Sequence, residues 1–195
     1  MKAVLISIKP KWCELIASGK KTIEVRKTKP KLDTPFKCYI YCTKDKGISF
    51  WTGKRYAYAD DRSHNLFDVC GNGKVIGEFV CDKIDYFSFS ESEWAYSVAP
   101  AGSVMPMHET KALKIMEEQG CLSLDDTNAY FGDEDYTAYF WHISNPVIYD
   151  KPRDLGEFRK PIECHRGKDR ENCVGCWDCE ITRPPQSWCY VEKLV

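Results

Sequence analysis

The first 26 residues contain three short segments whose apolar patterns predict a strand, a helix and a second strand in quick succession. Lys2–Ile8 is an apolar run typical of a strand, and Pro10 follows it at a point where a helix can begin without losing a hydrogen bond. Apolar residues then repeat at helical spacing until Gly19. Residues 22–26 alternate strictly between polar and apolar side chains, which is typical of a strand. The chain therefore begins as a mixed fold of strands and helices.

The rest of the chain continues this mixed pattern. Residues 44–72 read as a long connection that contains several aromatic residues. Residues 109–119 have helical periodicity that ends at Gly120. Further strands are predicted at residues 37–43, 74–81, 138–143, 147–149 and 187–192. Residues 84–89 form another strand or continue the one at 74–81. Many short strands with two helices predict an α+β fold, a small and mostly antiparallel β-barrel with flanking helices. We expect residues 1–195 to form one domain.

Composition and apolar run lengths exclude several classes of protein. Hydrophobic residues make up 43% of the chain and charged residues 29%, values near those of an average globular domain. This composition excludes a disordered tail, a collagenous repeat and a coiled-coil rod. No apolar run near the start is long enough for a signal peptide or a membrane span. We therefore expect a cytoplasmic protein with no membrane partner.

Charge is unevenly distributed along a chain whose net charge is −1. Residues 1–31 hold nine Lys or Arg and only two Glu, whereas residues 115–150 hold eight acidic residues and no Lys or Arg. This segregation favours a protein with one basic face. The alternative is that the acidic stretch packs near the basic one and cancels its charge.

Residues 19–26 match the pattern G-x-K-x-x-E-x-R. Lys21 follows the turn at Gly19, while Glu24 and Arg26 share the polar face of the predicted strand, with Thr22 at its start. Two cations with a carboxylate between them can hold a phosphate, while the carboxylate fixes the cations or takes a proton. The alternative is a surface ladder of salt bridges with little functional meaning.

With this motif and the strand and helix before it, the chain resembles the ASCH family, whose members share the PUA-like β-barrel. The resemblance is best over residues 2–31 and continues through residues 75–80 and 139–144. The tail at residues 183–189 resembles that of the longer ASCH proteins of phages and mobile elements.

The resemblance implies an RNA-related function, because ASCH domains are placed with RNA-associated domains and their PUA relatives bind structured RNA. Some small bacterial members are amidohydrolases that remove the acetyl group of N4-acetylcytidine with a Lys, a Thr and a Glu. The Lys matches Lys21, but Glu24 stands where those enzymes have the Thr nucleophile. A carboxylate there could still act as a base toward water or a ribose 2′-hydroxyl.

These observations predict an RNA-binding or modified-nucleoside-binding protein with a basic cleft around Lys21, Glu24 and Arg26. Trp51 and Tyr56 are the best candidates for stacking on exposed bases. The first alternative is a hydrolase, a ribonuclease or a nucleoside amidohydrolase, that uses the same cleft with Lys21 and Glu24 as catalytic residues. The second is a protein-interaction module of a mobile element.

A cysteine cluster near the C-terminus has the spacing of a metal site. Its four residues are Cys164, Cys173, Cys176 and Cys179. Four thiolates complete the tetrahedral shell of a structural zinc ion, so we predict a zinc-binding insertion at about residues 163–183. His165 or Cys189 could replace one ligand. An iron–sulfur cluster is the alternative occupant of this spacing.

Overall fold

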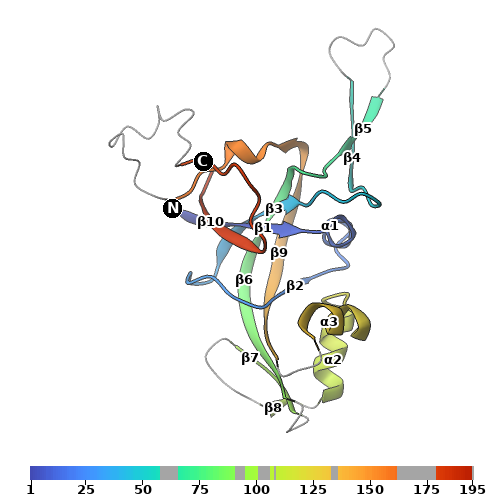
Figure 1. Ribbon diagram of the computed structural model, residues 1–195, viewed down its shortest axis with the longest axis vertical. Helices are drawn as coiled ribbons and strands as arrows, with labels where there is room; N and C mark the ends of the chain where they lie inside the picture. The colour runs from blue at the N-terminus through green and yellow to red at the C-terminus, as the bar shows by residue number, and fades with distance from the viewer. Residues whose placement is uncertain are drawn as a thin grey trace. The chain divides into compact units, whose positions relative to one another are not determined.

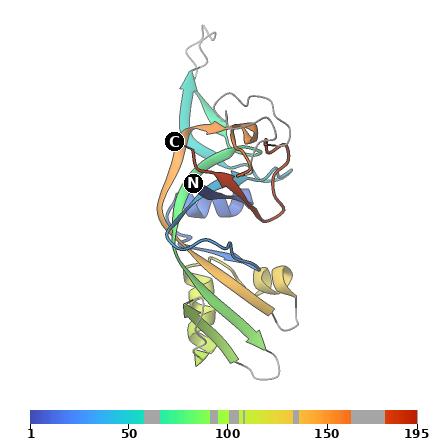
Figure 2. The ribbon, with the colours of Figure 1, turned by 90° about the vertical axis from the view of Figure 1, so that its left-hand side faces the viewer.

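The computed structural model of this chain describes residues 1–57, 66–90, 95–100, 106–107, 109–132, 136–161 and 179–194 (Figure 1). The chain forms two compact units, each assembled from separate segments. Unit 1 consists of Met1–Glu14, Lys37–Phe79 and Val147–Val195, and unit 2 of Leu15–Phe36 and Val80–Pro146. Two long strands contribute residues to both units, β6 at Val75–Ser90 and β9 at Tyr136–Arg153. Figure 2 shows both strands as continuous ribbons.

Unit 1 is built around β1, which covers Lys2–Ile8 and pairs on both edges. It runs antiparallel to β10 (Trp188–Glu192) and parallel to β3 (Phe36–Cys42). Residues 3–8 are all buried, which explains why this strand is a nearly continuous apolar run. The other elements of the unit are β4 at Trp51–Ala57, β5 at Leu66–Cys70 and a 3-10 helix at Leu155–Glu157.

The core of unit 1 is formed by side chains from several of these strands. Its buried members are Ala3, Leu5, Tyr39, Tyr41, Val75, Phe158, Ile181 and Val191. Gly77 lies where β6 approaches the end of β9 most closely, because a Cβ atom there would sit 2.2 Å from the carbonyl oxygen of Val147. Only glycine fits this approach.

Unit 2 contains the short strand β2 (Ile23–Arg26), which pairs antiparallel with β9. β9 also pairs with β6, and β6 continues into an antiparallel ladder with β7 and β8. The remaining elements are β7 at Ala95–Pro100, β8 at Pro106–Met107, α2 at Glu109–Glu118 and α3 at Leu124–Phe131. The core consists of Ile23, Val25, Met116, Ala138 and Phe140.

Helix α1 spans Pro10–Ala17, and the chain then turns sharply toward β2. Gly19 has a φ of 73°, a left-handed conformation that favours glycine, and its N–H donates to the carbonyl of Ile16. The helix therefore ends where the sequence predicts, and the turn brings Lys21 directly before the strand.

The predicted α+β class, with mostly antiparallel strands, is confirmed. Among the described strands the order β10-β1-β3-β6-β7-β8 does not close into a ring. Several details differ from the prediction. Helix α3 and the strands β4, β5, β7 and β8 were not predicted, and β9 is one strand where the sequence indicated two. β6 is a single strand, so residues 84–89 continue the strand before them. β9 continues past Pro146 because Asn145 takes a φ of 49° and both residues are exposed, so no buried ladder donor is lost.

Candidate functional site

The pairing of β2 with β9 separates polar from apolar side chains. Glu24 lies opposite Trp141 and Arg26 opposite Tyr139, so these four side chains share one face of the ladder. Ile23 and Val25 point to the other face, where they join the core of unit 2. The alternation predicted for this strand is confirmed.

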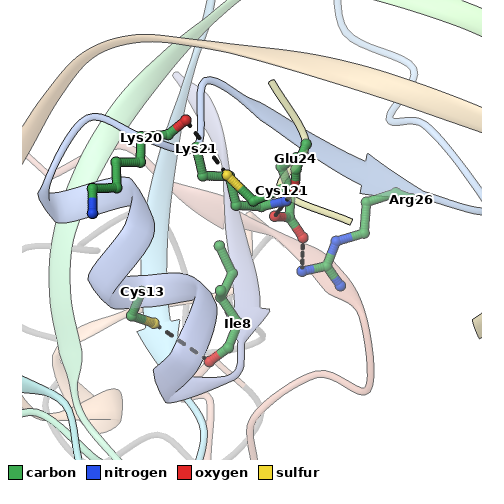
Figure 3. A network of polar contacts seen from close by, with 8 residues as sticks. Ile8, Cys13, Lys20, Lys21, Glu24, Arg26 and Cys121 are labelled. Atoms are coloured by element: carbon green, nitrogen blue, oxygen red, sulfur yellow. Dashed lines mark hydrogen bonds and ion pairs between the residues drawn. The ribbon is translucent and has the colours of Figure 1, made fainter. Parts of the chain in front are cut away.

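Three charged side chains form a buried network on the polar side of β2 (Figure 3). The Glu24 carboxylate lies between two cations, 2.8 Å from Nη2 of Arg26 and 3.6 Å from Nζ of Lys21. Lys21 is 2% exposed, Glu24 6% and Arg26 7%. Three formal charges are thus removed from water together. Without the carboxylate, two buried cations would repel each other.

Lys21 also ties a distant segment to this network. Its ammonium donates to the carbonyl oxygen of Gly120 at 2.5 Å. The same segment is held by backbone bonds from Thr22 and Ile23 to the carbonyl of Gln119, at 2.9 and 3.1 Å. Burial lowers the pKa of Lys21, while the Glu24 carboxylate raises it in partial compensation. Lys21 is therefore buried, because the turn after α2 covers it.

Thr22, Trp51 and Tyr56 are the other predicted binding residues. The Thr22 side chain is exposed, and its backbone is engaged on both sides, since its carbonyl accepts from Ile143 at 2.8 Å. Trp51 is 54% exposed in β4 of unit 1, as expected for a stacking candidate. Tyr56 pairs with Phe67 in the ladder of β4 and β5, but its side chain lies outside the described residues.

Helix α3 brings a tyrosine that sequence reasoning missed to the end of β2. Tyr130 is 41% exposed, and its hydroxyl accepts a hydrogen bond from the backbone of Lys27. Burial raises the pKa of Tyr130, the nearby Arg26 charge lowers it and Glu24 raises it, so the ring adjoins the charged network. The Lys27 ammonium lies 5.1 Å from the centre of the Tyr130 ring.

A sequence signal for this helix does exist. Ser123 and Asp126 form a capping box, in which each side chain bonds the backbone of the other residue. The spacing Ser-x-x-Asp therefore marks the start of α3 and would have placed Tyr130 on its last turn.

A second lysine and tyrosine pair includes a residue of the polar face. Tyr139 is the residue opposite Arg26, and the ammonium of Lys29 lies 5.9 Å from the centre of its ring. Tyr86 of β6 meets the Tyr139 ring edge to face, with 5.8 Å between ring centres. Lys27 and Lys29 are both exposed, and Tyr139 is half-buried. We call Lys27, Lys29, Tyr130 and Tyr139 together the lysine–tyrosine surface.

His142 belongs to a separate polar cluster on the opposite face of β9. Its Nε2 lies 2.8 Å from Oδ2 of the buried Asp85, which also pairs with Lys83. Burial alone would raise the pKa of Asp85. The hydrogen bonds with His142 and Lys83 outweigh this effect, so the pKa of Asp85 is lowered. His142 is thus a hydrogen-bonded structural histidine.

The predicted zinc ligands cannot be placed as a set. Cys164, Cys173, Cys176 and also His165 lie outside the described residues. Cys179 is buried, and its carbonyl accepts from the backbone of Lys160 at 2.8 Å. Within the described ranges no group of three or more His, Cys, Asp or Glu side chains could hold a metal ion. The zinc site stays a prediction.

Comparison with known proteins agrees with the resemblance that the motif indicates. A family model described as the ASCH domain matches residues 6–153, about three quarters of the chain, including β2 and β9. The chain belongs to the ASCH domain family. Members of this family are generally thought to bind RNA. No curated protein matches the chain.

Solved structures show the same fold. The crystal structure of ASCH from Zymomonas mobilis is 17% identical, with a TM-score of 0.53, and the match covers 98% of this chain and 88% of that one. A tyrosine-to-phenylalanine mutant of the Zymomonas mobilis protein matches with a TM-score of 0.50 at 17% identity, over 99% of this chain and 92% of that one. In the described parts of the ASCH chain, no helix has the length and apolar character needed to cross a membrane.

Proposed function

We propose that this ASCH protein binds RNA, or a modified nucleoside within RNA, through the lysine–tyrosine surface of unit 2. The observations that carry the proposal are two exposed lysines, Lys27 and Lys29, whose ammonium groups lie 5.1 and 5.9 Å from the centres of the Tyr130 and Tyr139 rings. Tyr139 also lies opposite Arg26, a buried cation of the network. Surfaces that bind single-stranded RNA combine cations, which contact its phosphates, with aromatic rings, which stack on its bases.

The charged residues differ in burial, and we assign them different roles for that reason. Lys21 and Arg26 are too enclosed to be the main contacts to an anion, so they act as a scaffold that sets the local potential. The exposed ammonium groups of Lys27 and Lys29 are free to move on flexible stems toward phosphates.

The same geometry favours binding over hydrolysis. Both oxygens of Glu24 face cations, Oε1 toward Arg26 and Oε2 toward Lys21. A carboxylate held in this way serves as a counterion, and to act as a general base it would have to give up one of these ion pairs. The Lys21 ammonium likewise donates a hydrogen bond to the Gly120 carbonyl, and it would have to give up this bond to act in catalysis.

The test is a fluorescence anisotropy titration with labelled single-stranded and hairpin RNAs at about 50 and about 200 mM salt. We expect binding that weakens as salt rises, and a smaller salt slope in the double variant Lys27→Ala, Lys29→Ala. Lys2→Ala is the matched control, because Lys2 of unit 1 also lies over a tyrosine ring, 5.8 Å from the centre of Tyr190. Absence of binding at low salt, or equal slopes in the double variant and wild type, would overturn the proposal.

Chromatography of the same mixtures tests the alternative function. The protein is incubated with RNA and, separately, with N4-acetylcytidine, and the products are separated. We expect no turnover. Cleaved RNA or released cytidine that disappears in Glu24→Gln would replace the binding function with a hydrolase. Competition by free N4-acetylcytidine against labelled RNA would identify the modified nucleoside as the ligand.

A further inference from the structure

Two tyrosine rings adjoin Arg26, and each belongs to a different aromatic cluster. Tyr139 lies directly opposite Arg26 in the β2–β9 ladder and touches Tyr86. Tyr130 is bonded to the backbone of Lys27 and packs on Phe131, with 4.7 Å between ring centres. The two rings are thus anchored independently, one on a strand and one on a helix.

One exposed lysine lies over each ring. Lys27 lies over Tyr130 and Lys29 over Tyr139, and the two lysines are two residues apart in the chain. An exposed cation–π contact is worth only about 0.5–1 kcal/mol, so an incoming base can take the place of the ammonium on the ring. The displaced ammonium then remains within reach of the phosphate attached to that base.

We propose that the lysine–tyrosine surface holds two successive unstacked nucleotides of single-stranded RNA, one base on Tyr130 and the next on Tyr139. Lys27 and Lys29 pair with the phosphates. This inference rests on the proposed RNA-binding function and specifies its ligand.

Base pairing is incompatible with this mode of binding. A ring can stack on a base only when the base has left its neighbours, so the bases of a duplex are excluded from both tyrosines. A duplex can meet the lysines alone, through its phosphates. The surface should therefore discriminate single strands from duplexes, and its affinity should depend on having two adjacent nucleotides.

The experiment compares a 5′-phosphorylated uridine mononucleotide, the corresponding dinucleotide, a uridine octamer and a blunt RNA duplex by titration. We expect the dinucleotide to bind wild type at least about tenfold more tightly than the mononucleotide, because it gains a second stacked base. In Tyr130→Leu or Tyr139→Leu this gain should vanish, and octamer affinity should fall by about five- to 150-fold.

Controls separate stacking from packing. Tyr130→Phe and Tyr139→Phe keep the ring and should stay within about twofold of wild type, since stacking needs no hydroxyl. Tyr190→Leu, at the tyrosine beneath Lys2 in unit 1, should not change octamer affinity. Should a leucine variant fail to fold, a dinucleotide carrying 2-aminopurine at either position reports stacking on the wild-type protein through loss of fluorescence.

The outcomes distinguish this inference from the function on which it rests. Equal affinity for mononucleotide and dinucleotide, unchanged octamer affinity in both leucine variants, or unquenched 2-aminopurine at either position would overturn the two-nucleotide inference while RNA binding stands. If none of the four ligands binds even at low salt, the proposed function itself is wrong.

Discussion

Replacing Glu24 by Gln tests whether the buried network has the electrostatic role assigned to it. The substitution keeps the shape of the side chain and removes the negative charge that Glu24 places between Lys21 and Arg26. Removing one partner of a buried ion pair typically costs 3–5 kcal/mol, because the remaining charge is left without compensation. Gln can still accept a hydrogen bond from Arg26, so we expect the lower end, a loss of about 3 kcal/mol in the free energy of unfolding.

Urea unfolding followed by circular dichroism measures this loss through the shift in the midpoint at constant slope. For a chain of 195 residues the same loss lowers the melting temperature by about 6–12 °C. The matched control is Glu117→Gln on α2, where the carboxylate is exposed, and it should change stability by no more than about 0.5 kcal/mol.

One result would refute the reasoning. If Glu24→Gln is as stable as Glu117→Gln, Glu24 does not neutralise buried charge, and the three side chains form only an exposed salt-bridge ladder in solution. A large loss at Glu24 with no loss at Glu117 supports the network, whatever the RNA titrations show.

Three further predictions address other features. Burial lowers the folded-state pKa of Lys21 below 10.5, so the unfolded chain binds the proton more tightly. Wild type should therefore gain stability relative to Lys21→Met as the pH rises toward 10.5, and urea titrations that show a flat or falling difference contradict the burial argument. Gly77→Ala places a Cβ against the Val147 carbonyl and should cost about 3 kcal/mol, whereas Gly156→Ala, with nothing within 4 Å, should be nearly neutral in thermal melts. Mass spectrometry should find about one zinc per chain, lost in Cys176→Ser together with thermal stability; iron with a visible absorption band would indicate a cluster instead, and no metal would end the prediction.

Local patterns were enough to predict the start of the fold. β1 and α1 depend on short-range apolar spacing and on Pro10 and Gly19, and each lies where these signals place it. The faces of β2 follow from strand alternation alone, which put Glu24 and Arg26 on one side. Such features need no knowledge of the rest of the chain.

The burial of Lys21 could not be predicted in this way. Its hydrogen-bond partner, the Gly120 carbonyl, is 99 residues away in the sequence, and nothing in the motif shows that the turn after α2 lies over it. The position of Tyr130 beside Lys27 has the same origin, since it depends on how α3 packs. The motif therefore identified the network, but its enclosure and the adjoining surface are properties of tertiary structure.

The way the chain is divided between the two units limits how this protein can be cut or rearranged. The units together comprise five segments that alternate along the chain, so the backbone passes from one unit to the other four times. No single truncation yields either unit whole, and proteolysis at one crossing leaves fragments that each carry parts of both. Joining the termini would leave the alternation in place, so a circular permutant would still interleave the two. An ancestor could therefore not have acquired unit 2 by simple fusion of a ready-made gene to the end of another, and engineers who want the lysine–tyrosine surface alone must build a new connection between residues 36 and 80.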